Sequence, residues 1–453
     1  MLSDQKTDRG NWNSKLGFVL AAAGSAVGLG NIWGFPTQVA DNGGASFILI
    51  YVICCLTVGL PVMIAEFAIG RHTRRNPVGA FKKLGRGWFP PLIGLWGVMC
   101  GVMILSFYLV IAGWTVGFVF EEIFHFLGLT EASQWVSDLG NGPKNAFFTV
   151  LFMLATIGII TGGVSNGIER ATKTMMPILI LVLIVMIGYV FTLEGSFEGL
   201  KLYLLPDLSA INTGLVFAAL GQAFFSLSLG MGALLTYGSY LKKNQNIVES
   251  AAYVTVADMS IAFLAGLLII PAMFVAQHAG ITIMGEDGRL FSSATLVFDV
   301  LPNLFKSMGG FFGLIFGVSF FILLSMAALT STISLLEVPV SYVIDEHKVS
   351  RKKAALLVGG TVMAFAVIIS FHTALIDILA NIFNNVGLPL GGLMLSLFLA
   401  YFWTTERAIA EIRHGFEDLD NTRFAGIWTF FIKYLCPILI ALVLVTTLYN
   451  MVS

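Results

Sequence analysis

The sequence predicts an all-α polytopic membrane protein with 11 transmembrane helices, and two observations lead to this prediction. Of the 453 residues, 57% are hydrophobic and only 11% are charged, whereas soluble proteins carry about 25% charged residues. Apolar stretches of about 20 residues, the length that crosses a bilayer, recur along the whole chain. The composition excludes a soluble enzyme and a disordered chain, and the net charge of −1 argues against a nucleic-acid partner.

The apolar stretches define the expected spans and their orientation. They lie at residues 16–40, 45–70, 90–124, 145–162, 168–192, 212–239, 247–276, 310–342, 350–370, 375–402 and 427–450. Of the 25 Lys and Arg residues, all but Lys144, Lys201, Arg289 and Lys306 fall in the N-terminal tail or in alternate connections. Because basic residues stay on the cytoplasmic side, we expect a cytoplasmic N-terminus, an external C-terminus and insertion in the inner (plasma) membrane.

The chain is expected to form one membrane domain over residues 1–453. It contains no low-complexity tract, and we expect no soluble domain and no cleavable signal peptide before the first apolar stretch. All four cysteines lie in apolar runs rather than in loops. We therefore expect them to be buried free thiols and not disulfides or metal ligands.

Two of the expected spans are rich in glycine at their centres. The segments are Gly24–Pro36 in the first span and Gly221–Gly232 in the sixth. Each Gly weakens a helix by about 1 kcal/mol relative to Ala, although glycines also serve close helix packing.

The two segments open two blocks of five helices, at about 16–192 and 212–402, followed by an extra helix at about 427–450. An odd number of helices per block inverts the second block. Interrupted helices in corresponding positions of inverted repeats point to a transporter binding site.

Four polar residues from four helices are expected at one depth in the bilayer. Counted from the nearest basic residue at the cytoplasmic end, each lies roughly 22–26 Å into the membrane at 1.5 Å per residue. They are Asn31, Ser226, Asp258 and Ser331. Their convergence predicts a polar site near the middle of the membrane.

Asp258 is the most informative of these residues. A carboxylate at a helix centre costs about 2.5–3.5 kcal/mol on insertion scales and by default marks a functional site. No Lys or Arg is expected at that depth, so a bound cation or a transferable proton is the natural counter-charge; the alternative is a protonated Asp bonded to a neighbouring helix. Hard cations such as Na⁺ take oxygen ligands. Glu66 and Glu337 lie nearer the cytoplasmic end, and Glu66 is expected to reach toward Arg71 as a structural anchor.

At these residues the chain resembles the neurotransmitter:sodium symporter family. The resemblance runs from Trp12 to the eleventh helix, and the twelfth helix of many members is absent. The matching motifs are Gly24–Pro36, Asp41–Gly44, Glu66–Arg71, Gly167–Arg170, Phe224–Gly232 and Leu329–Ser331. The resemblance implies the LeuT fold and Na⁺-driven import of an amino acid by alternating access.

The resemblance also implies which residues form the sodium sites. One or two sodium ions are expected, and two are favoured. The first would use the Ala26 carbonyl, Asn31, Ser226, Asp258 and the substrate carboxylate. The second would use the carbonyls of Gly24, Val27 and Ala327 and the hydroxyls of Thr330 and Ser331. On the cytoplasmic side an inner gate is implied at Arg9, Trp12, Tyr240 and Asp345.

The implied substrate site favours a neutral apolar or aromatic amino acid. Its carboxylate would meet the amides of Leu29 and Gly30 and the hydroxyl of Tyr108, and its ammonium the carbonyls of Ala26, Phe225 and Ser226, with Ser228 nearby. Its side chain would lie among Met103, Ile104, Phe225, Met231 and Leu335, a set with no charge and no obvious polar group. Met231 suggests breadth, because a flexible thioether adapts to several shapes.

Two departures from the family pattern bear on function. Gly34 and Ala380 replace the usual Arg and Asp of the outer gate, which leaves Tyr108 and Phe225, with Trp33 or Asp377 as further candidates. Asp258 stands where animal members have a neutral residue and use chloride, so we expect chloride-independent transport.

Three other functions are alternatives to sodium symport. A proton-coupled transporter of the same fold would use Asp258 as its carrier, but a proton needs no pair of hydroxyls such as Thr330 and Ser331. A non-transporting amino-acid receptor would need a cytoplasmic signalling domain. An enzyme is not expected, since the Gly-x-Ser-x-Gly pattern at residues 163–167 lacks its strand–turn–helix context.

Overall fold

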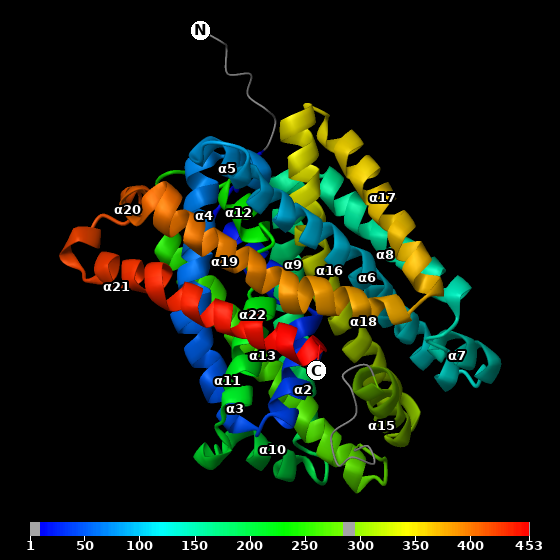
Figure 1. Cartoon of the computed structure of the whole chain (residues 1–453). Helices are drawn as coiled ribbons and strands as arrows, with labels where there is room; N and C mark the ends of the chain where they lie inside the picture. Colours follow the sequence, from blue (N-terminus) through cyan, green and yellow to red (C-terminus); the bar gives the residue numbers. More distant parts are fainter. Residues whose placement is uncertain (1–9, 284–294, 453) are drawn as a thin grey trace.

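The computed structural model describes residues 10–283 and 295–452, and its regular elements there are all helical (Figure 1). The elements of the first half are α1 (Lys15–Ala26), η1 (Gly30–Gly34), α2 (Phe35–Asp41), α3 (Ala45–Cys54), η2 (Cys55–Gly59), α4 (Leu60–Thr73), α5 (Pro77–Leu84), α6 (Phe89–Phe126), α7 (Thr130–Ser137), α8 (Gly142–Thr161), η3 (Val164–Glu169), α9 (Arg170–Val190), α10 (Ser196–Leu204) and η4 (Leu208–Ala210).

The second half also consists of long helices, several of them containing short π-helical segments. Its elements are α11 (Thr213–Ser226), α12 (Ala233–Gly238), α13 (Ile247–His278), η5 (Leu296–Val300), α15 (Leu301–Ser307), α16 (Gly310–His347), α17 (Arg351–Phe371), α18 (Ala374–Ala380), η6 (Asn381–Gly387), α19 (Leu388–Phe398), η7 (Leu399–Thr404), α20 (Thr405–Arg413), η8 (Leu419–Asn421), α21 (Phe424–Phe430), η9 (Phe431–Leu435) and α22 (Cys436–Val452).

The membrane spans agree with the predicted stretches. Within the described residues, 9 helices are long and apolar enough to cross a bilayer, or up to 10 if the bent pair Lys15–Ala26 and Gly30–Asp41 is one span. The remaining predicted stretch, 212–239, is divided between α11 and α12, each too short to cross alone. The two spans predicted to be broken are therefore the two that the structure interrupts.

The outer surface of the bundle is apolar where a soluble protein would be charged. Leu181, Val185, Leu357 and Val445 are each more than 60% exposed and lie on α9, α17 and α22. Large contiguous apolar surfaces of this kind mark contact with membrane or protein. The chain thus has the surface of a multi-pass membrane protein. The four cysteines are buried and free, as predicted.

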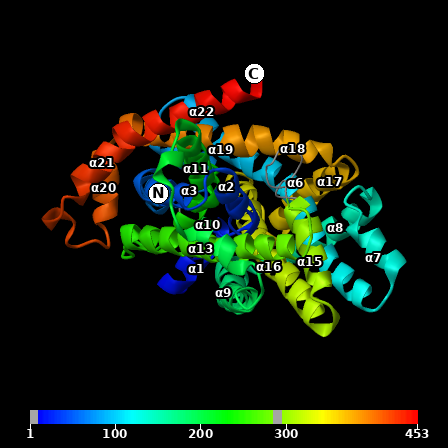
Figure 2. The same cartoon turned by 90° about the horizontal axis from the view of Figure 1, so that it is seen from below.

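The short helices divide between the two ends of the bundle. Figure 1 shows α5 and α20 near one end and α10 and α15 near the other. The end with α5 and α20 also carries Arg71 and Arg351 and is called the basic end below. Seen from below, α19 to α22 follow one edge, while α13 and α16 pass close to the first, interrupted span (Figure 2).

The two interruptions have local causes in the sequence. α1 stops at Ala26 and the helix resumes in η1 after a bend of 55°. A Cβ atom on Gly28 would lie 2.4 Å from Ser331 Oγ, so glycine is required by close approach at that point. Between α11 and α12, Gly230 and Gly232 have φ values of +82° and +77°, a region that favours glycine. The glycines at the two interruptions therefore serve both purposes: Gly28 allows close packing, and Gly230 and Gly232 allow the helix to unwind.

Candidate functional site

The two interruptions lie against each other in the middle of the bundle. The hydroxyl of Ser228, in the second break, donates to the Ser25 carbonyl at the end of α1, at 2.9 Å. The amide of Gln222 on α11 donates to the Gly30 carbonyl at 3.1 Å. Backbone groups that the helices leave unpaired are thus used to join one broken span to the other.

A buried polar cluster surrounds Asp258 beside these breaks. The carboxylate accepts a hydrogen bond from Asn31 Nδ2 at 2.7 Å and from Ser226 Oγ at 2.7 Å. All three residues are at most 1% exposed. The predicted convergence of these three residues is therefore found in the structure. Among the ion pairs of the part of the chain that the structure describes, none includes Asp258.

Tyr51 on α3 is a member of this cluster that the sequence analysis missed. Its hydroxyl lies 3.0 Å from Ser226 Oγ and 3.2 Å from Asp258 Oδ2, and the residue is 1% exposed. The signal that could have found it is a tyrosine in the middle of the second apolar stretch, since a buried phenol needs a hydrogen-bond partner.

A second group of oxygen atoms lies between α1 and α16. Thr330 Oγ1 donates to the Ala327 carbonyl at 2.9 Å and contacts the Val27 carbonyl at 3.3 Å. Gly24 packs on the same threonine, since a Cβ atom there would lie 3.3 Å from Thr330 Cβ. Ser331 faces Gly28, one residue beyond Val27. Carbonyl and hydroxyl oxygens are the ligands that hard cations take.

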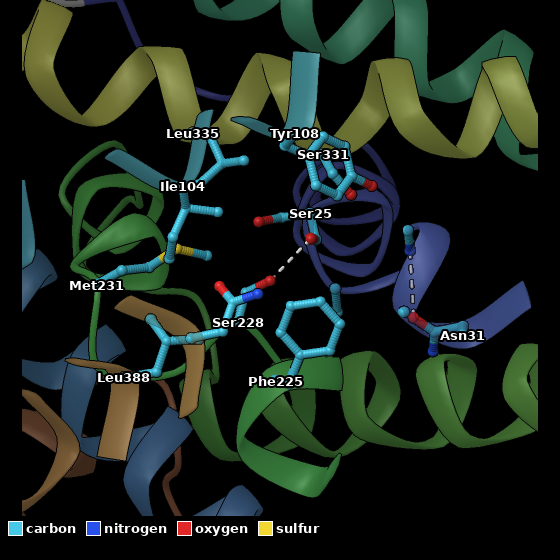
Figure 3. Close-up of a pocket in the computed structure, with 14 residues that line it drawn as sticks. Ser25, Asn31, Ile104, Tyr108, Phe225, Ser228, Met231, Ser331, Leu335 and Leu388 are labelled. Carbon is cyan, nitrogen blue, oxygen red and sulfur yellow. Dashed lines mark hydrogen bonds between the residues drawn. The ribbon is translucent and has the colours of Figure 1, made fainter. Parts of the chain in front are cut away.

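A pocket lies next to both groups and is mostly apolar (Figure 3). The space between its walls, including the part continuous with solvent, is about 410 Å³. It is lined by Ser25, Ala26, Gly28, Gly30, Asn31, Ile104, Tyr108, Phe225, Ser228, Met231, Ser331, Leu335, Asn384 and Leu388.

Most of the predicted substrate residues line this pocket, and three do not. Met103 is half-buried and lies outside the lining, as do Leu29 and Ser226. Leu29 is nonetheless adjacent, because its backbone N–H donates to Tyr108 Oη at 3.0 Å. The lining also includes Gly28, which was quoted only as part of the first-helix motif, and three residues that the sequence analysis missed: Ser25, Asn384 and Leu388. Ser25 was within the quoted first-helix motif and could have been chosen, whereas no pattern singled out the other two.

Buried aromatic residues pack together at the basic end of the bundle. Trp12 is 1% exposed, donates its indole N–H to the Tyr237 carbonyl at 3.0 Å, and has its ring 6.2 Å from that of Tyr240. Tyr240 in turn donates to Glu337, which pairs with Arg351 at 2.5 Å. The structure thus brings together Trp12 and Tyr240 of the predicted inner gate.

The two charged members of that predicted gate have different outcomes. Asp345 Oδ2 accepts the backbone N–H and the side-chain amide of Asn76, at 2.8 and 3.0 Å, at the start of α5. Arg9 lies outside the described residues. The proposed pairing of these two residues therefore stays a prediction.

Glu66 does not reach toward Arg71, which corrects the sequence prediction for this residue. Its carboxylate accepts the backbone N–H of Gly230, inside the second break, at 2.8 Å and that of Leu235, in the first turn of α12, at 3.1 Å. The unwound backbone there leaves N–H groups without helical partners, and a buried carboxylate satisfies two of them. Glu66 is thus a brace for the interrupted span.

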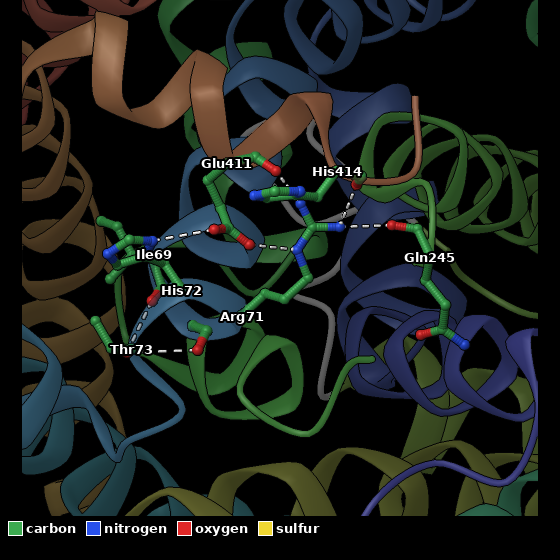
Figure 4. A network of polar contacts seen from close by, with 8 residues as sticks. Ile69, Arg71, His72, Thr73, Gln245, Glu411 and His414 are labelled. Carbon is green, nitrogen blue, oxygen red and sulfur yellow. Dashed lines mark hydrogen bonds and ion pairs between the residues drawn. The ribbon is translucent and has the colours of Figure 1, made fainter. Parts of the chain in front are cut away.

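Arg71 instead holds a network at the basic end (Figure 4). Its guanidinium pairs with the Glu411 carboxylate at 2.7 Å and also donates to the Glu411 carbonyl. The same group donates to the Gln245 and His414 carbonyls at 2.5 and 2.9 Å. This buried ion pair holds α20 against α4. The two residues are more than 300 positions apart, so the sequence did not predict their contact.

On the opposite side of the pocket, aromatic rings pack together near Gly34, which replaces the Arg of the outer-gate pair implied by the family resemblance. A Cβ atom on Gly34 would have no neighbour within 4 Å. The Trp33 ring packs at 5.5 Å on Phe298, which also contacts Trp114 and Phe118 at 5.6 and 5.0 Å. Of the two further candidates for the outer gate, the structure therefore brings Trp33 into an aromatic cluster.

A membrane bundle with two interrupted helices and an apolar pocket at their junction has the architecture of a secondary transporter. The model of the sodium:neurotransmitter symporter family matches residues 9–139 and 129–453, so the chain belongs to this family. The resemblance found from the motifs is confirmed, and this family of transporters is not one of enzymes.

Similar proteins agree with this assignment. The crystal structure of MhsT in complex with L-phenylalanine is 39% identical, covers 97% of this chain and 100% of that one, and has a TM-score of 0.84, which confirms the LeuT fold. The uncharacterized sodium-dependent transporter YhdH of Bacillus subtilis is 34% identical over 98% of both chains. The uncharacterized sodium-dependent transporter MJ1319 of Methanocaldococcus jannaschii is 30% identical over 98% of this chain and 92% of its own length.

Proposed function

We propose that the chain is a sodium-coupled symporter that imports neutral amino acids with apolar or aromatic side chains by alternating access. One observation carries the proposal: Asp258 is buried next to two interrupted helices and an apolar pocket, and no basic residue of the described chain pairs with it. A buried carboxylate needs a compensating charge, and a family defined by sodium dependence supplies Na⁺ as that charge. The L-phenylalanine bound by MhsT supports the substrate class.

Two sodium ions fit the two oxygen groups. The first would be held by Asp258, Asn31, Ser226 and the Ala26 carbonyl, together with the substrate carboxylate. Sharing that carboxylate would couple substrate binding to sodium binding. The second would be held by the carbonyls of Gly24, Val27 and Ala327 and the hydroxyls of Thr330 and Ser331.

The second sodium ion would act between two helices. Its ligands come from α1 and α16, which are joined in this region by the contact of Thr330 with the Val27 carbonyl. Binding there would favour the arrangement in which these helices are close, and release would free α1 to move. The coupling is a differential affinity of the ion for two arrangements.

The amino acid would lie across the two breaks. Its carboxylate would accept from the amides of Leu29 and Gly30 and from Tyr108, and its ammonium would donate to the carbonyls of Ala26, Phe225 and Ser226. Free amide ends of a half-helix favour an anion, and free carbonyl ends favour a cation. We propose a cytoplasmic N-terminus, an external C-terminus and the inner (plasma) membrane, on the strength of the basic-residue asymmetry.

Uptake of radiolabelled phenylalanine into proteoliposomes tests the coupling ion. We expect uptake against a concentration gradient with an inward sodium gradient alone and none with a proton gradient alone. Accumulation driven by protons without sodium would favour the proton-coupled alternative. Sodium-dependent binding with no uptake under any gradient would favour a receptor.

Chloride is expected to be dispensable. With Asp258 the compensating negative charge is part of the protein, so replacing chloride by gluconate on both sides should change the initial uptake rate by less than about twofold. The measurement is sodium-driven uptake in the two anions at equal ionic strength. A loss of most of the uptake in gluconate would contradict the proposal.

Tyr51→Phe tests whether the phenol supports the first sodium site. Removing a hydroxyl that contacts both Ser226 and Asp258 deletes one hydrogen bond, so the sodium affinity should fall by about 2- to 10-fold. Sodium titration of phenylalanine binding measures it, with Tyr253→Phe, at an exposed tyrosine, as the matched control. Equal sodium affinities in both variants would remove Tyr51 from the site.

A further inference from the structure

Two polar atoms in the wall of the pocket have no hydrogen-bond partner among the residues that the structure describes. They are the hydroxyl oxygen of Ser25 and the amide oxygen of Asn384, and both are shielded from solvent. Buried polar groups in native proteins are nearly always paired with protein, water or ligand. Two such atoms from different helices in one pocket therefore point to a ligand that bonds them.

Ser25 is placed to bond a ligand rather than the protein. The residue is 1% exposed, and its carbonyl is already engaged by Ser228 Oγ, at 2.9 Å. In Figure 3 the Ser25 hydroxyl is directed into the pocket, on the side where Ile104 and Met231 lie. That side is the part of the pocket expected to take the substrate side chain.

Asn384 lies in η6, in the tenth predicted span, and differs from the other asparagines of that segment. Asn381 and Asn385 are exposed and bond each other, Nδ2 of Asn385 to Oδ1 of Asn381, at 2.9 Å. Asn384 is half-buried and lines the pocket, and its amide oxygen lacks a donor. An acceptor left unpaired in such a place costs about 1–3 kcal/mol.

The other residues of the pocket restrict which kind of substrate side chain can carry the hydrogen-bond donor for Asn384. Ile104, Met231, Leu335 and Leu388 are apolar, and Phe225 presents an aromatic ring (Figure 3). A charged or strongly polar side chain would lose hydration here without enough partners. A flat ring suits this environment, since a thioether and a phenyl group both contact aromatic rings favourably.

We propose that Asn384, assisted by Ser25, determines specificity by reading a single N–H or O–H group on the substrate side chain. The pocket then selects neutral aromatic amino acids with an indole or phenol over those with a phenyl ring. This inference rests on the proposed function, because it concerns the substrate of the same site. It replaces the expectation, drawn from the sequence, that the pocket contains no polar group able to recognise a side chain.

Asn384→Leu tests the proposal while keeping the volume of the side chain. Binding of radiolabelled phenylalanine in saturating sodium is displaced by unlabelled phenylalanine, tyrosine and tryptophan. In the unmodified protein, tyrosine and tryptophan should bind about 3- to 10-fold tighter than phenylalanine, the worth of one hydrogen bond. In Asn384→Leu the preference should fall below about twofold, with phenylalanine affinity nearly unchanged.

Asn385→Leu is the matched control, because this neighbouring asparagine is exposed, and it should keep the full preference. Ser25→Ala should reduce the preference in part. If Asn384→Leu is not recovered folded, Asn384→Ser gives the same comparison with a polar side chain too short to reach the ligand. Equal losses for all three amino acids, or an unchanged preference, would overturn the proposal.

The outcomes separate this inference from the proposed function. Sodium-dependent phenylalanine binding with no preference in the unmodified protein would overturn only the role of Asn384. Absence of sodium-dependent binding of any of the three amino acids would overturn both.

Discussion

Asp258→Ala is expected to lower the sodium affinity of substrate binding by about 100-fold or more. The substitution removes the negative charge that the proposed first sodium ion would face in a buried site, and loss of one partner of a buried charge pair costs about 3–5 kcal/mol. The measurement is the sodium dependence of radiolabelled phenylalanine binding to the purified protein.

Two further variants make this result specific. Asp258→Asn keeps the shape of the side chain and should fail in the same way if charge is the cause. Asp299→Ala removes an exposed carboxylate and should leave sodium affinity unchanged. A sodium affinity in Asp258→Ala equal to that of the unmodified protein would refute the assignment of the first site.

Glu66→Ala is expected to weaken phenylalanine binding by about tenfold or more and to lower the melting temperature in detergent. The carboxylate is the acceptor for the N–H groups of Gly230, inside the second break, and Leu235, in the first turn of α12. Each buried donor left unpaired costs about 1–3 kcal/mol. Thermal unfolding and binding, measured on the same preparation, report the two effects.

Glu66→Gln should lie between Ala and the unmodified protein, because its one carbonyl oxygen can serve only one of the two donors. Glu131→Ala, at an exposed position of α7, is the control and should change neither quantity. Full stability and binding in Glu66→Ala would show that the break holds its shape without this brace.

Much of the site could be predicted because the membrane makes depth readable. Basic residues cluster at the predicted cytoplasmic ends of the spans, so counting residues from them placed Asn31, Ser226 and Asp258 at one level, where the structure joins them by hydrogen bonds. Depth alone does not show how each helix is rotated about its axis, and therefore which of its residues face the site. Tyr51 and Asn384 were missed, although they lie in predicted spans.

The reason is physical. In a soluble helix the polar and apolar faces reveal which side is buried. In this bundle the face toward lipid and the face toward other helices are both apolar, so the pattern along α3 or around η6 does not say which residue points inward. The predicted partner of Glu66 was wrong for a related reason. Arg71 is close to Glu66 in the sequence, but the N–H groups at the second break have no helical acceptor, and the Glu66 carboxylate accepts from them instead.

The sequence by itself determined the membrane class, the expected spans, the two interrupted helices and the scarcity of charge that makes Asp258 conspicuous. Tertiary structure decided which polar groups bond each other: Tyr51 with Asp258, Glu66 with Gly230, Arg71 with Glu411, and two pocket atoms, on Ser25 and Asn384, with nothing in the described chain. Such pairings depend on how helices far apart in the chain are rotated and packed. Composition and spacing fix the depth of a residue, but only packing fixes its partner.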